Sequence, residues 1–317
     1  MHVIITGGAG FIGSNLAEKM LTMGYTVTIV DNFEPFYPKH IKLQNIATFY
    51  KHPNLYFKEI DILNVADLYT QLTHTYDAII HLAAKAGVRA SIQNPVGFQE
   101  INVKGTQNLL EFAKFKQINQ FIFASSSSVY GINDKFPWCE EDAVLHPISP
   151  YASTKVSCEL LGHVYSHLYR IRFIALRFFT VYGPKQRPDL AIHAFSKKII
   201  QQQPIQLFGN GSTERDYTYV SDIVDGILAS LHYHKSWYEV INLGNCHTVS
   251  LSTMLATLEN TLCQKAIVEY LPEQPGDVPK TFANIQKAQQ LLNYQPKVAF
   301  EEGIQLFKNW LLQTTSA

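Results

Sequence analysis

The segment from residue 7 to residue 13, which reads Gly-Gly-Ala-Gly-Phe-Ile-Gly, constrains the fold more than any other part of the chain. It follows an apolar run at residues 2–6 and leads to a second apolar run at residues 26–30, which ends at Asp31. Clustered glycines between two such runs indicate a strand, a tight turn, a helix and a second strand. The start of the chain therefore predicts a βαβ unit.

The glycines of this segment have roles that side chains would prevent. The first glycines, Gly7 among them, allow the turn, and Gly10 lets backbone N–H groups approach a pyrophosphate at the start of the helix. Gly13 lets the helix pack closely on the sheet. Asp31 would accept hydrogen bonds from an adenosine ribose and repel a 2′-phosphate, and residues 32–34 supply no arginine to receive one. The pattern predicts a dinucleotide site that favours NAD over NADP.

Composition excludes several classes of function. The chain has 317 residues with 26 basic and 26 acidic side chains, so a nucleic-acid surface is not expected to be its main function. No stretch approaches the roughly 20 apolar residues that span a bilayer, and the first residues lead into a strand without a charged signal segment. We therefore expect a cytoplasmic protein. The cysteines and histidines form no C-x-x-C pair or metal-ligand pattern, so we expect no disulfide framework and no metal site.

Further apolar runs predict strands that alternate with helical patterns, at residues 55–60, 77–82, 120–124 and 172–177. This alternation is typical of a parallel, doubly wound α/β sheet, whose ligands gather at the carboxyl ends of the strands. We expect residues 1–177 to form this Rossmann domain, with a return segment near residues 216–240. The remainder, residues 178–317, is expected to form mainly a smaller, mixed α/β lobe that binds the substrate.

Tyr151 and Lys155 are the second chemical signal. At a spacing of four residues on a helix, the two side chains share one face. A nearby ammonium favours a phenolate, so Lys155 is expected to lower the pKa of Tyr151 and make it a usable base near neutral pH. The serine cluster at residues 125–128 follows the fifth predicted strand and would lie at the same edge of the sheet. The alternative is a surface tyrosine beside a solvated lysine.

Six motifs follow one another along the chain, at residues 6–13, 31–32, 81–84, 125–131, 151–155 and 215–220. In this order the chain resembles, over essentially its whole length, the extended short-chain dehydrogenases/reductases that act on nucleotide sugars. The resemblance implies that Tyr151 is the general base, that Lys155 also holds the nicotinamide ribose, and that Ser126 hydrogen-bonds the reacting hydroxyl. The other NAD-binding positions that it implies are Gly7, Gly10, Phe11, Ile12, Gly13, Asp31, Asn32, Asp61, Ile62, Leu82, Ala83, Ala84, Lys85, Asn102 and Phe178.

The resemblance also implies a reaction: oxidation at C4 of a hexose attached to UDP, then reduction on the other face, with NAD regenerated in each cycle. Related 4,6-dehydratases carry Asp-Glu directly after the position of Ser126, and UDP-glucuronate decarboxylases carry a glutamate at the position of Ser128. Here Ser127 and Ser128 stand at these positions. A serine without an activating partner is too weak a base to remove the C5 proton, so we expect an epimerase.

The sugar is indicated by three runs that are similar to those of UDP-glucuronate 4-epimerases, at residues 84–89, 180–191 and 276–279. UDP-glucose 4-epimerases usually carry asparagine at the position of Thr180. Arg187 is expected to pair with a carboxylate at C6 of the sugar; a surface salt bridge is the alternative. The substrate-binding positions that the resemblance implies are Arg89, Ser127, Ser128, Thr180, Arg187, Ala191, Gln206, Phe208, Arg215 and Asp277.

Several alternatives stay open. A neutral UDP-sugar epimerase, a UDP-glucuronate decarboxylase and a non-catalytic nucleotide-sugar sensor all fit parts of the pattern, whereas Asp31 opposes an NADPH-dependent reductase. For Arg215, a structural ion pair is the alternative to a diphosphate contact. Family members usually dimerise through the helix near residues 100–116 and the helix that starts at Tyr151. We therefore expect a homodimer that binds a UDP-sugar, without a nucleic-acid or membrane partner.

Overall fold

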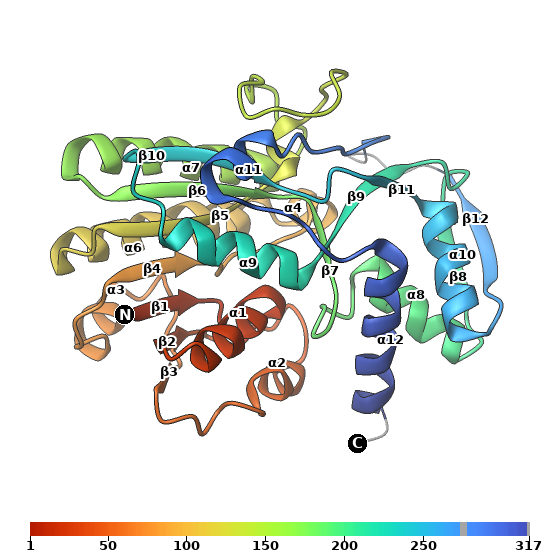
Figure 1. Cartoon of the computed structure of the whole chain (residues 1–317), viewed down its shortest axis with the longest axis horizontal. Coiled ribbons are helices and arrows are strands. Elements are labelled where there is room, and N and C mark those ends of the chain that lie inside the picture. The colour runs from red at the N-terminus through yellow and green to blue at the C-terminus, as the bar shows by residue number, and fades with distance from the viewer. Residues whose placement is uncertain (273–277, 316–317) are drawn as a thin grey trace.

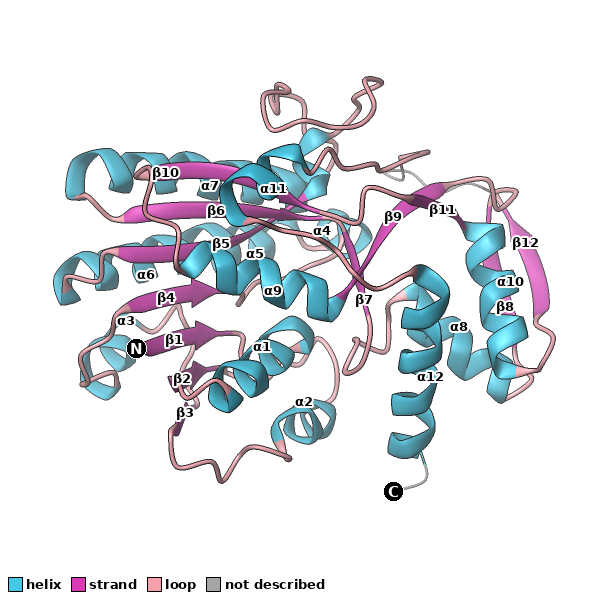
Figure 2. Cartoon of the chain, in the orientation of Figure 1, coloured by secondary structure: helices cyan, strands magenta, loops and turns pink. Residues whose placement is uncertain are grey.

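A seven-stranded parallel sheet forms the centre of the molecule (Figures 1 and 2). The computed structural model describes residues 1–272 and 278–315. The strand order is β10-β6-β5-β4-β1-β2-β3. The strands are β1 His2–Thr6, β2 Thr26–Val30, β3 Leu55–Lys58, β4 Ala78–His81, β5 Gln120–Ser126, β6 Arg172–Phe178 and β10 Tyr238–Leu243. The order reverses between β1 and β4, which opens a crevice at the carboxyl ends of these strands. The predicted doubly wound α/β fold is confirmed.

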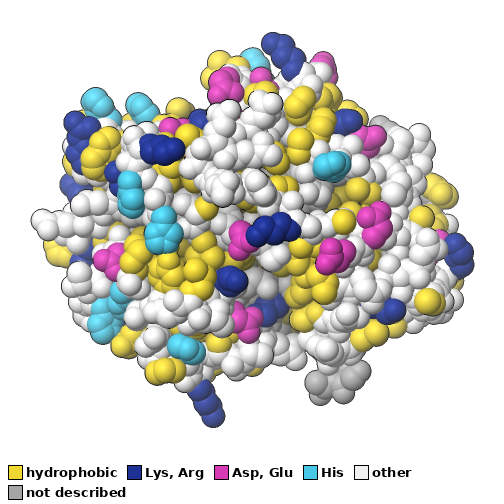
Figure 3. Space-filling view, viewed as in Figure 1, with side chains coloured by type: hydrophobic (Ala, Val, Ile, Leu, Met, Phe, Trp, Pro, Cys, Tyr) yellow, Lys and Arg dark blue, Asp and Glu magenta, His cyan; other side chains and the backbone are white. Residues whose placement is uncertain are grey.

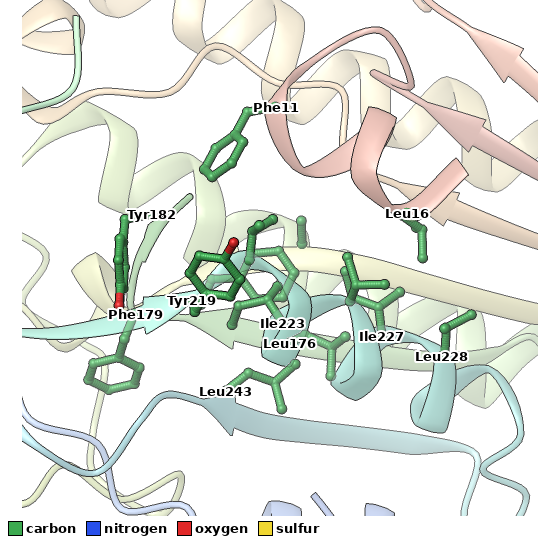
Figure 4. Packing of buried hydrophobic residues seen from close by; sticks show 14 of the residues in the cluster. Phe11, Leu16, Leu176, Phe179, Tyr182, Tyr219, Ile223, Ile227, Leu228 and Leu243 are labelled. Carbon is green, nitrogen blue, oxygen red and sulfur yellow. The ribbon is translucent and has the colours of Figure 1, made fainter. Parts of the chain in front are cut away.

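Helices cover both faces of this sheet, as Figure 1 shows. One face carries α1 Phe11–Thr22, α2 Lys39–Ile46, α9 Val220–Leu231 and α11 Gln286–Leu292, and the other carries α3 Val65–Gln71, α6 Gly105–Lys116 and α7 Pro150–Tyr169. Leu16 of α1 and Ile227 of α9 belong to one apolar cluster with Leu176 of β6 (Figure 4). Because helices pack on both sides, all four residues of β4 are buried, which explains the apolar run at residues 78–80.

The segment between β4 and β5 is helical but is not one regular α-helix. After α4 Val88–Gln93, the chain forms α5 Pro95–Phe98, a π-helical segment η1 Gln99–Lys104, and then α6. A π-helical segment inserts extra backbone into a helix and often marks a functional region. This segment carries Asn102, one of the predicted NAD-binding residues.

The smaller lobe lies beyond the carboxyl ends of the central strands, at the right of Figure 1. It contains a three-stranded sheet of β7 Thr180–Tyr182, β9 Glu214–Tyr219 and β11 Thr248–Ser250, and a pair of β8 Pro204–Phe208 and β12 Ile267–Leu271. Its helices are α8 Ala191–Ile200, α10 Leu251–Leu262 and α12 Phe300–Thr315. Between β9 and β11 the chain returns to the large sheet as α9 and β10, so the two parts are interleaved in sequence.

The surface carries charges of both signs. Figure 3 shows Lys and Arg side chains interspersed with Asp and Glu on one face, in keeping with the net charge of zero. Within the described part of the chain, no helix has the length and apolar character needed to cross a membrane. The four cysteines are free thiols at positions 139, 158, 246 and 263.

Candidate active site

A cavity of about 380 Å³ lies at the carboxyl ends of the central strands. Its wall combines the glycine turn after β1, the ends of β2, β4 and β5, the start of α7 and the segment that leads from β6 into the lobe. The predicted site residues that line it are Gly7, Gly10, Phe11, Ile12, Gly13, Asp31, Asn32, Asp61, Ile62, Leu82, Ala83, Ala84, Lys85, Ser126, Tyr151, Lys155, Phe178, Thr180 and Arg187. Folding therefore brings most of the predicted positions to one place.

The glycine turn is packed so closely that side chains are excluded. Gly7 has a φ of +70°, and a Cβ on it would lie 2.8 Å from the backbone nitrogen of Ala83. A Cβ on Gly13, in the first turn of α1, would collide with the carbonyl oxygen of Gly7, so this glycine lets the helix pack against the turn itself. Helix α1 begins at Phe11, and no side chain among the described residues caps it. Its first N–H groups can therefore bind an anion.

Asp31 connects the end of β2 to this turn. Its buried carboxylate accepts hydrogen bonds from the backbone N–H groups of Ala9, at 3.1 Å, and Phe33, at 2.9 Å. The ammonium of Lys42, from α2, lies 3.7 Å from the same carboxylate and is also buried. No local sequence pattern marks Lys42, because its position near Asp31 depends on how α2 packs.

Asn102 differs from the other predicted NAD-binding residues, because it lies behind the described cavity wall and does not line it. Its side-chain amide accepts a hydrogen bond from Lys85 N at 2.8 Å and donates to Lys85 O at 3.0 Å. It also donates to Thr154 Oγ1 of α7 at 3.0 Å. Asn102 therefore holds the segment after β4 against α7, and it can position Lys85 at the cavity.

Tyr151, Ser126 and Lys155 meet at the inner end of the cavity. Helix α7 starts at Pro150, and the Ser149 side chain caps it by accepting a hydrogen bond from Ala152 N at 3.1 Å. This start places Tyr151 in the first turn, where it lines the cavity together with Ser126 and Lys155. The structure extends β5 to Ser126, two residues beyond the predicted end of that strand.

Ser128 orients the hydroxyl of Ser126. Its backbone N–H and its hydroxyl both donate to Ser126 Oγ, at 3.2 Å and 2.9 Å. Because Ser126 Oγ accepts these two hydrogen bonds, its own proton is available for Tyr151. A proton donated to the phenol oxygen favours the phenolate form.

The pKa of Tyr151 is shifted in the direction opposite to the one that the sequence predicts. Burial raises this pKa above its ordinary value, and the Ser126 hydrogen bond and the positive charge of Arg187 oppose the rise. The predicted lowering by Lys155 is wrong. Lys155 Nζ donates to Ala124 O at 2.7 Å and lies 5.9 Å from the centre of the Tyr151 ring. Burial also lowers the pKa of Lys155, to about 8.

A buried ion pair that the sequence analysis missed supports the same region. Glu159, one helical turn after Lys155, accepts from Arg177 Nε at 3.0 Å and from Arg177 Nη2 at 2.8 Å, and both side chains are buried. Its Oε1 also accepts from Ser125 Oγ at 2.5 Å. The pair therefore joins α7, β5 and β6 directly beneath Ser126 and Lys155.

Arg187 lies at the outer side of the cavity and is held by several groups. It forms a two-point salt bridge with Asp189, with Nε 3.0 Å from Oδ1 and Nη2 2.6 Å from Oδ2. Its Nη2 also donates to Ala86 O at 3.3 Å, and its guanidinium lies 4.7 Å from the centre of the Phe36 ring. The salt bridge that was the alternative for Arg187 is thus present, although the side chain also faces the cavity.

The other predicted substrate positions lie outside the described lining of this cavity: Arg89, Ser127, Ser128, Ala191, Gln206, Phe208 and Arg215. The guanidinium of Arg89, in α4, lies 4.7 Å from the centre of the Phe208 ring in β8, which brings the large domain beside the lobe. Arg215 Nη1 donates to the carbonyl oxygen of Glu214 at 2.9 Å. Asp277 falls outside the described residues.

Comparison with known proteins places the chain in a family. A family model described as GDP-mannose 4,6 dehydratase matches residues 4–307, so the chain belongs to this family of extended short-chain dehydrogenases/reductases, and the resemblance seen in the sequence is confirmed. The chain is 42% identical over 311 residues to a UDP-glucuronate 4-epimerase of Thermodesulfobacterium geofontis, and the match covers 98% of this chain and 95% of the relative.

Two solved structures have folds closely similar to that of this chain. The crystal structure of UDP-glucuronic acid 4-epimerase from Bacillus cereus in complex with UDP-glucuronic acid and NAD matches with a TM-score of 0.93 and 37% identity, over 99% of this chain and 100% of that chain. The structure of UDP-glucose 4-epimerase with UDP-glucose from Thermotoga maritima matches with a TM-score of 0.91 and 31% identity, over 99% and 100% of the two chains.

The buried ion pair leads to a stability prediction. Glu159→Gln leaves the Arg177 guanidinium buried without its carboxylate, so we expect a loss of roughly 3–5 kcal/mol in the free energy of unfolding. The double variant Glu159→Leu/Arg177→Met should regain most of this loss, because it buries no unpaired charge. Urea unfolding followed by tryptophan fluorescence measures both.

Glu59→Gln is the matched control, because it breaks the exposed pair between Lys39 and Glu59, whose side chains are both about half exposed. Exposed ion pairs of this kind contribute roughly 0–1 kcal/mol to the free energy of unfolding. Equal losses from Glu159→Gln and Glu59→Gln would contradict the role given to the buried pair.

Proposed function

We propose that this protein is an NAD-dependent 4-epimerase of a UDP-sugar, and that its substrates are UDP-glucuronate and UDP-galacturonate. The observation that carries the proposal is the gathering of Tyr151, Ser126 and Lys155 in one cavity that the glycine turn also lines. The family membership and the 42% identity to a UDP-glucuronate 4-epimerase support it. So does the 37% identity to an enzyme solved with UDP-glucuronic acid and NAD.

The cavity has the features that a dinucleotide requires. The absent Cβ at Gly10 leaves room for a pyrophosphate beside the N-terminus of α1, and Asp31 lines the cavity at the end of β2. We assign NAD to residues 1–177 with the return segment near 216–240, and the UDP-sugar mainly to residues 178–317. When bound, NAD supplies the acceptor and the donor of the C4 hydride.

In the proposed reaction, Tyr151 removes the proton of the 4-hydroxyl and later returns a proton to the same oxygen. Ser126 would donate to the phenol oxygen, with its hydroxyl oriented for this role by the hydrogen bond that it accepts from Ser128 Oγ. Burial opposes the phenolate, so the Ser126 hydrogen bond and the charge of Arg187 are needed to bring Tyr151 toward a usable pKa. Lys155, with a pKa of about 8, stays mostly protonated at neutral pH and would hold the nicotinamide ribose.

The serines at positions 127 and 128 favour epimerisation over elimination or decarboxylation. Ser128 Oγ is already a donor to Ser126 Oγ, and neither hydroxyl is a base strong enough to remove the C5 proton. The 4-keto sugar would therefore be reduced again, on either face. Arg187 supports a uronate as the substrate, because its guanidinium already binds a carboxylate, that of Asp189, with two-point geometry at the cavity.

Incubation with four UDP-sugars tests the function, with no cofactor added and the products separated by chromatography. We expect UDP-glucuronate to give UDP-galacturonate, with UDP-glucose, UDP-N-acetylglucosamine and UDP-xylose turned over more slowly. Tyr151→Phe should lower kcat by roughly 100-fold or more, because it removes the base, while NAD stays bound. A UDP-pentose as the main product from UDP-glucuronate would indicate a decarboxylase. NAD bound without turnover of any sugar would indicate a sensor.

A neutral-sugar epimerase is the second candidate, favoured by the 31% identity to the Thermotoga maritima UDP-glucose 4-epimerase. The same incubations separate the two candidates. A higher kcat/KM for UDP-glucose than for UDP-glucuronate would establish the second and contradict the first.

Arg187→Ala tests the role of this guanidinium. A 4-ketoglucuronate loses CO₂ most readily when its C5–C6 bond lies perpendicular to the carbonyl plane, and Arg187 is proposed to hold the carboxylate away from this alignment. We therefore expect the variant to raise the ratio of UDP-pentose to UDP-galacturonate, measured by chromatography of the products. Asp189→Asn is the control, because it keeps the guanidinium and should leave the ratio low. An unchanged ratio in Arg187→Ala would count against this role.

We also propose a homodimer that is built from α6 and α7. Leu160, Val164 and Leu168 form an exposed apolar row along α7, and Phe115 of α6 is exposed as well. Leu160→Glu combined with Leu168→Glu should convert a dimer into a monomer, measured by light scattering during gel filtration. Tyr270→Glu, at an exposed site on β12, should stay dimeric. A monomeric wild type would contradict the proposal. The cytoplasmic location expected from the sequence stays a prediction.

A further inference from the structure

Tyr37 has a buried hydroxyl with no hydrogen-bond partner among the described residues. Only 9% of its surface is exposed, and it lies in the segment between β2 and α2, where it lines the cavity. A buried hydroxyl normally has a partner, because the lost contact with water is otherwise not replaced. An unpartnered hydroxyl at a cavity therefore indicates a ligand atom as its partner.

The place of this hydroxyl indicates what kind of atom that is. The position that a Cβ would occupy on Gly10 lies 4.0 Å from the Tyr37 oxygen, so the hydroxyl faces the N-terminus of α1. The first N–H groups of this helix, which no described side chain caps, all donate. A group bound among these donors must accept hydrogen bonds, and an anion does so best. Tyr37 would add one more donor to the same group.

The surroundings fix the ring of Tyr37 in this orientation. Lys42 Nζ lies 5.1 Å from the centre of the ring and donates to Glu34 O at 3.0 Å, which ties α2 to the segment that carries Tyr37. The ring of the preceding residue, Phe36, lies 4.7 Å from the Arg187 guanidinium. The hydroxyl is therefore already held in place, and little side-chain freedom would be lost on binding.

We propose that the Tyr37 hydroxyl donates a hydrogen bond to the pyrophosphate of the bound dinucleotide and thereby helps to retain it. This inference rests on the proposed NAD-dependent function. Tyr37 would then be a phosphate-binding side chain from the segment after β2, and it would act together with the backbone of the glycine turn. Because the hydroxyl has no protein partner to lose, its removal should not impair folding.

Exchange of bound NAD tests the inference. The purified wild type and Tyr37→Phe are incubated with isotopically labelled NAD, and the label taken up by the protein is followed over time. A hydrogen bond to a charged group accounts for roughly 10- to 100-fold in affinity, so we expect exchange to be faster by about that factor in Tyr37→Phe. Tyr76→Phe is the matched control, because Tyr76 is also a buried tyrosine but does not line the cavity. It should exchange at the wild-type rate.

Calorimetry of UDP binding to the same holoenzymes tests whether the Tyr37 hydroxyl contacts the diphosphate of NAD or that of the UDP-sugar. We expect the same Kd for UDP in the wild type and in Tyr37→Phe. Unchanged NAD exchange in Tyr37→Phe would overturn the inference, and a weaker UDP affinity in that case would assign the hydroxyl to the sugar nucleotide instead. A wild type that is purified without NAD and takes up no label would overturn the proposed function itself, which distinguishes the two failures.

Discussion

The close approach of the glycine turn to the end of β4 is the constraint on which the nucleotide site depends. A Cβ on Gly7 would lie 2.8 Å from the backbone of Ala83, so the turn can be this tight only without side chains. The Asp31 carboxylate holds the turn from the other side through Ala9 N. These contacts fix where α1 begins and where its N–H groups point. The position of Tyr37 relative to Gly10 follows from the same arrangement.

Burial is the largest influence on the pKa values of Tyr151 and Lys155. Burial disfavours the charged forms of both Tyr151 and Lys155, which raises one pKa and lowers the other. The structure offsets this cost with aligned donors and acceptors, since Ser126 contacts the phenol and Ala124 O accepts from the ammonium. Beneath them, the ion pair of Glu159 and Arg177 connects the helix and strands that carry these groups. In the proposed reaction, the protonation state of these two side chains would depend on contacts between elements more than on their spacing within one helix.

Arg187 joins the two parts of the molecule. It comes from the segment that enters the lobe, yet it contacts Phe36 and the carbonyl oxygen of Ala86 in the large domain. Its carboxylate partner, Asp189, is half exposed at the edge of the cavity. A uronate carboxylate entering the cavity would compete with Asp189 for the same guanidinium. The proposed recognition of the sugar by Arg187 would thus use the same contacts that join the domain and the lobe.

The sequence by itself determined the features that depend on neighbours along the chain: the glycine turn, the alternation of strands and helices, and the shared helix face of Tyr151 and Lys155. Most of the cofactor positions predicted from the sequence line one cavity, because parallel strands end at the same edge. Only the tertiary structure decided that Asn102 lies behind the wall, that burial raises the pKa of Tyr151, and that Lys42 and Tyr37 face the cavity. These features depend on distances between segments that are far apart in the chain and on the loss of water during folding. A local pattern of residues predicts neither of them.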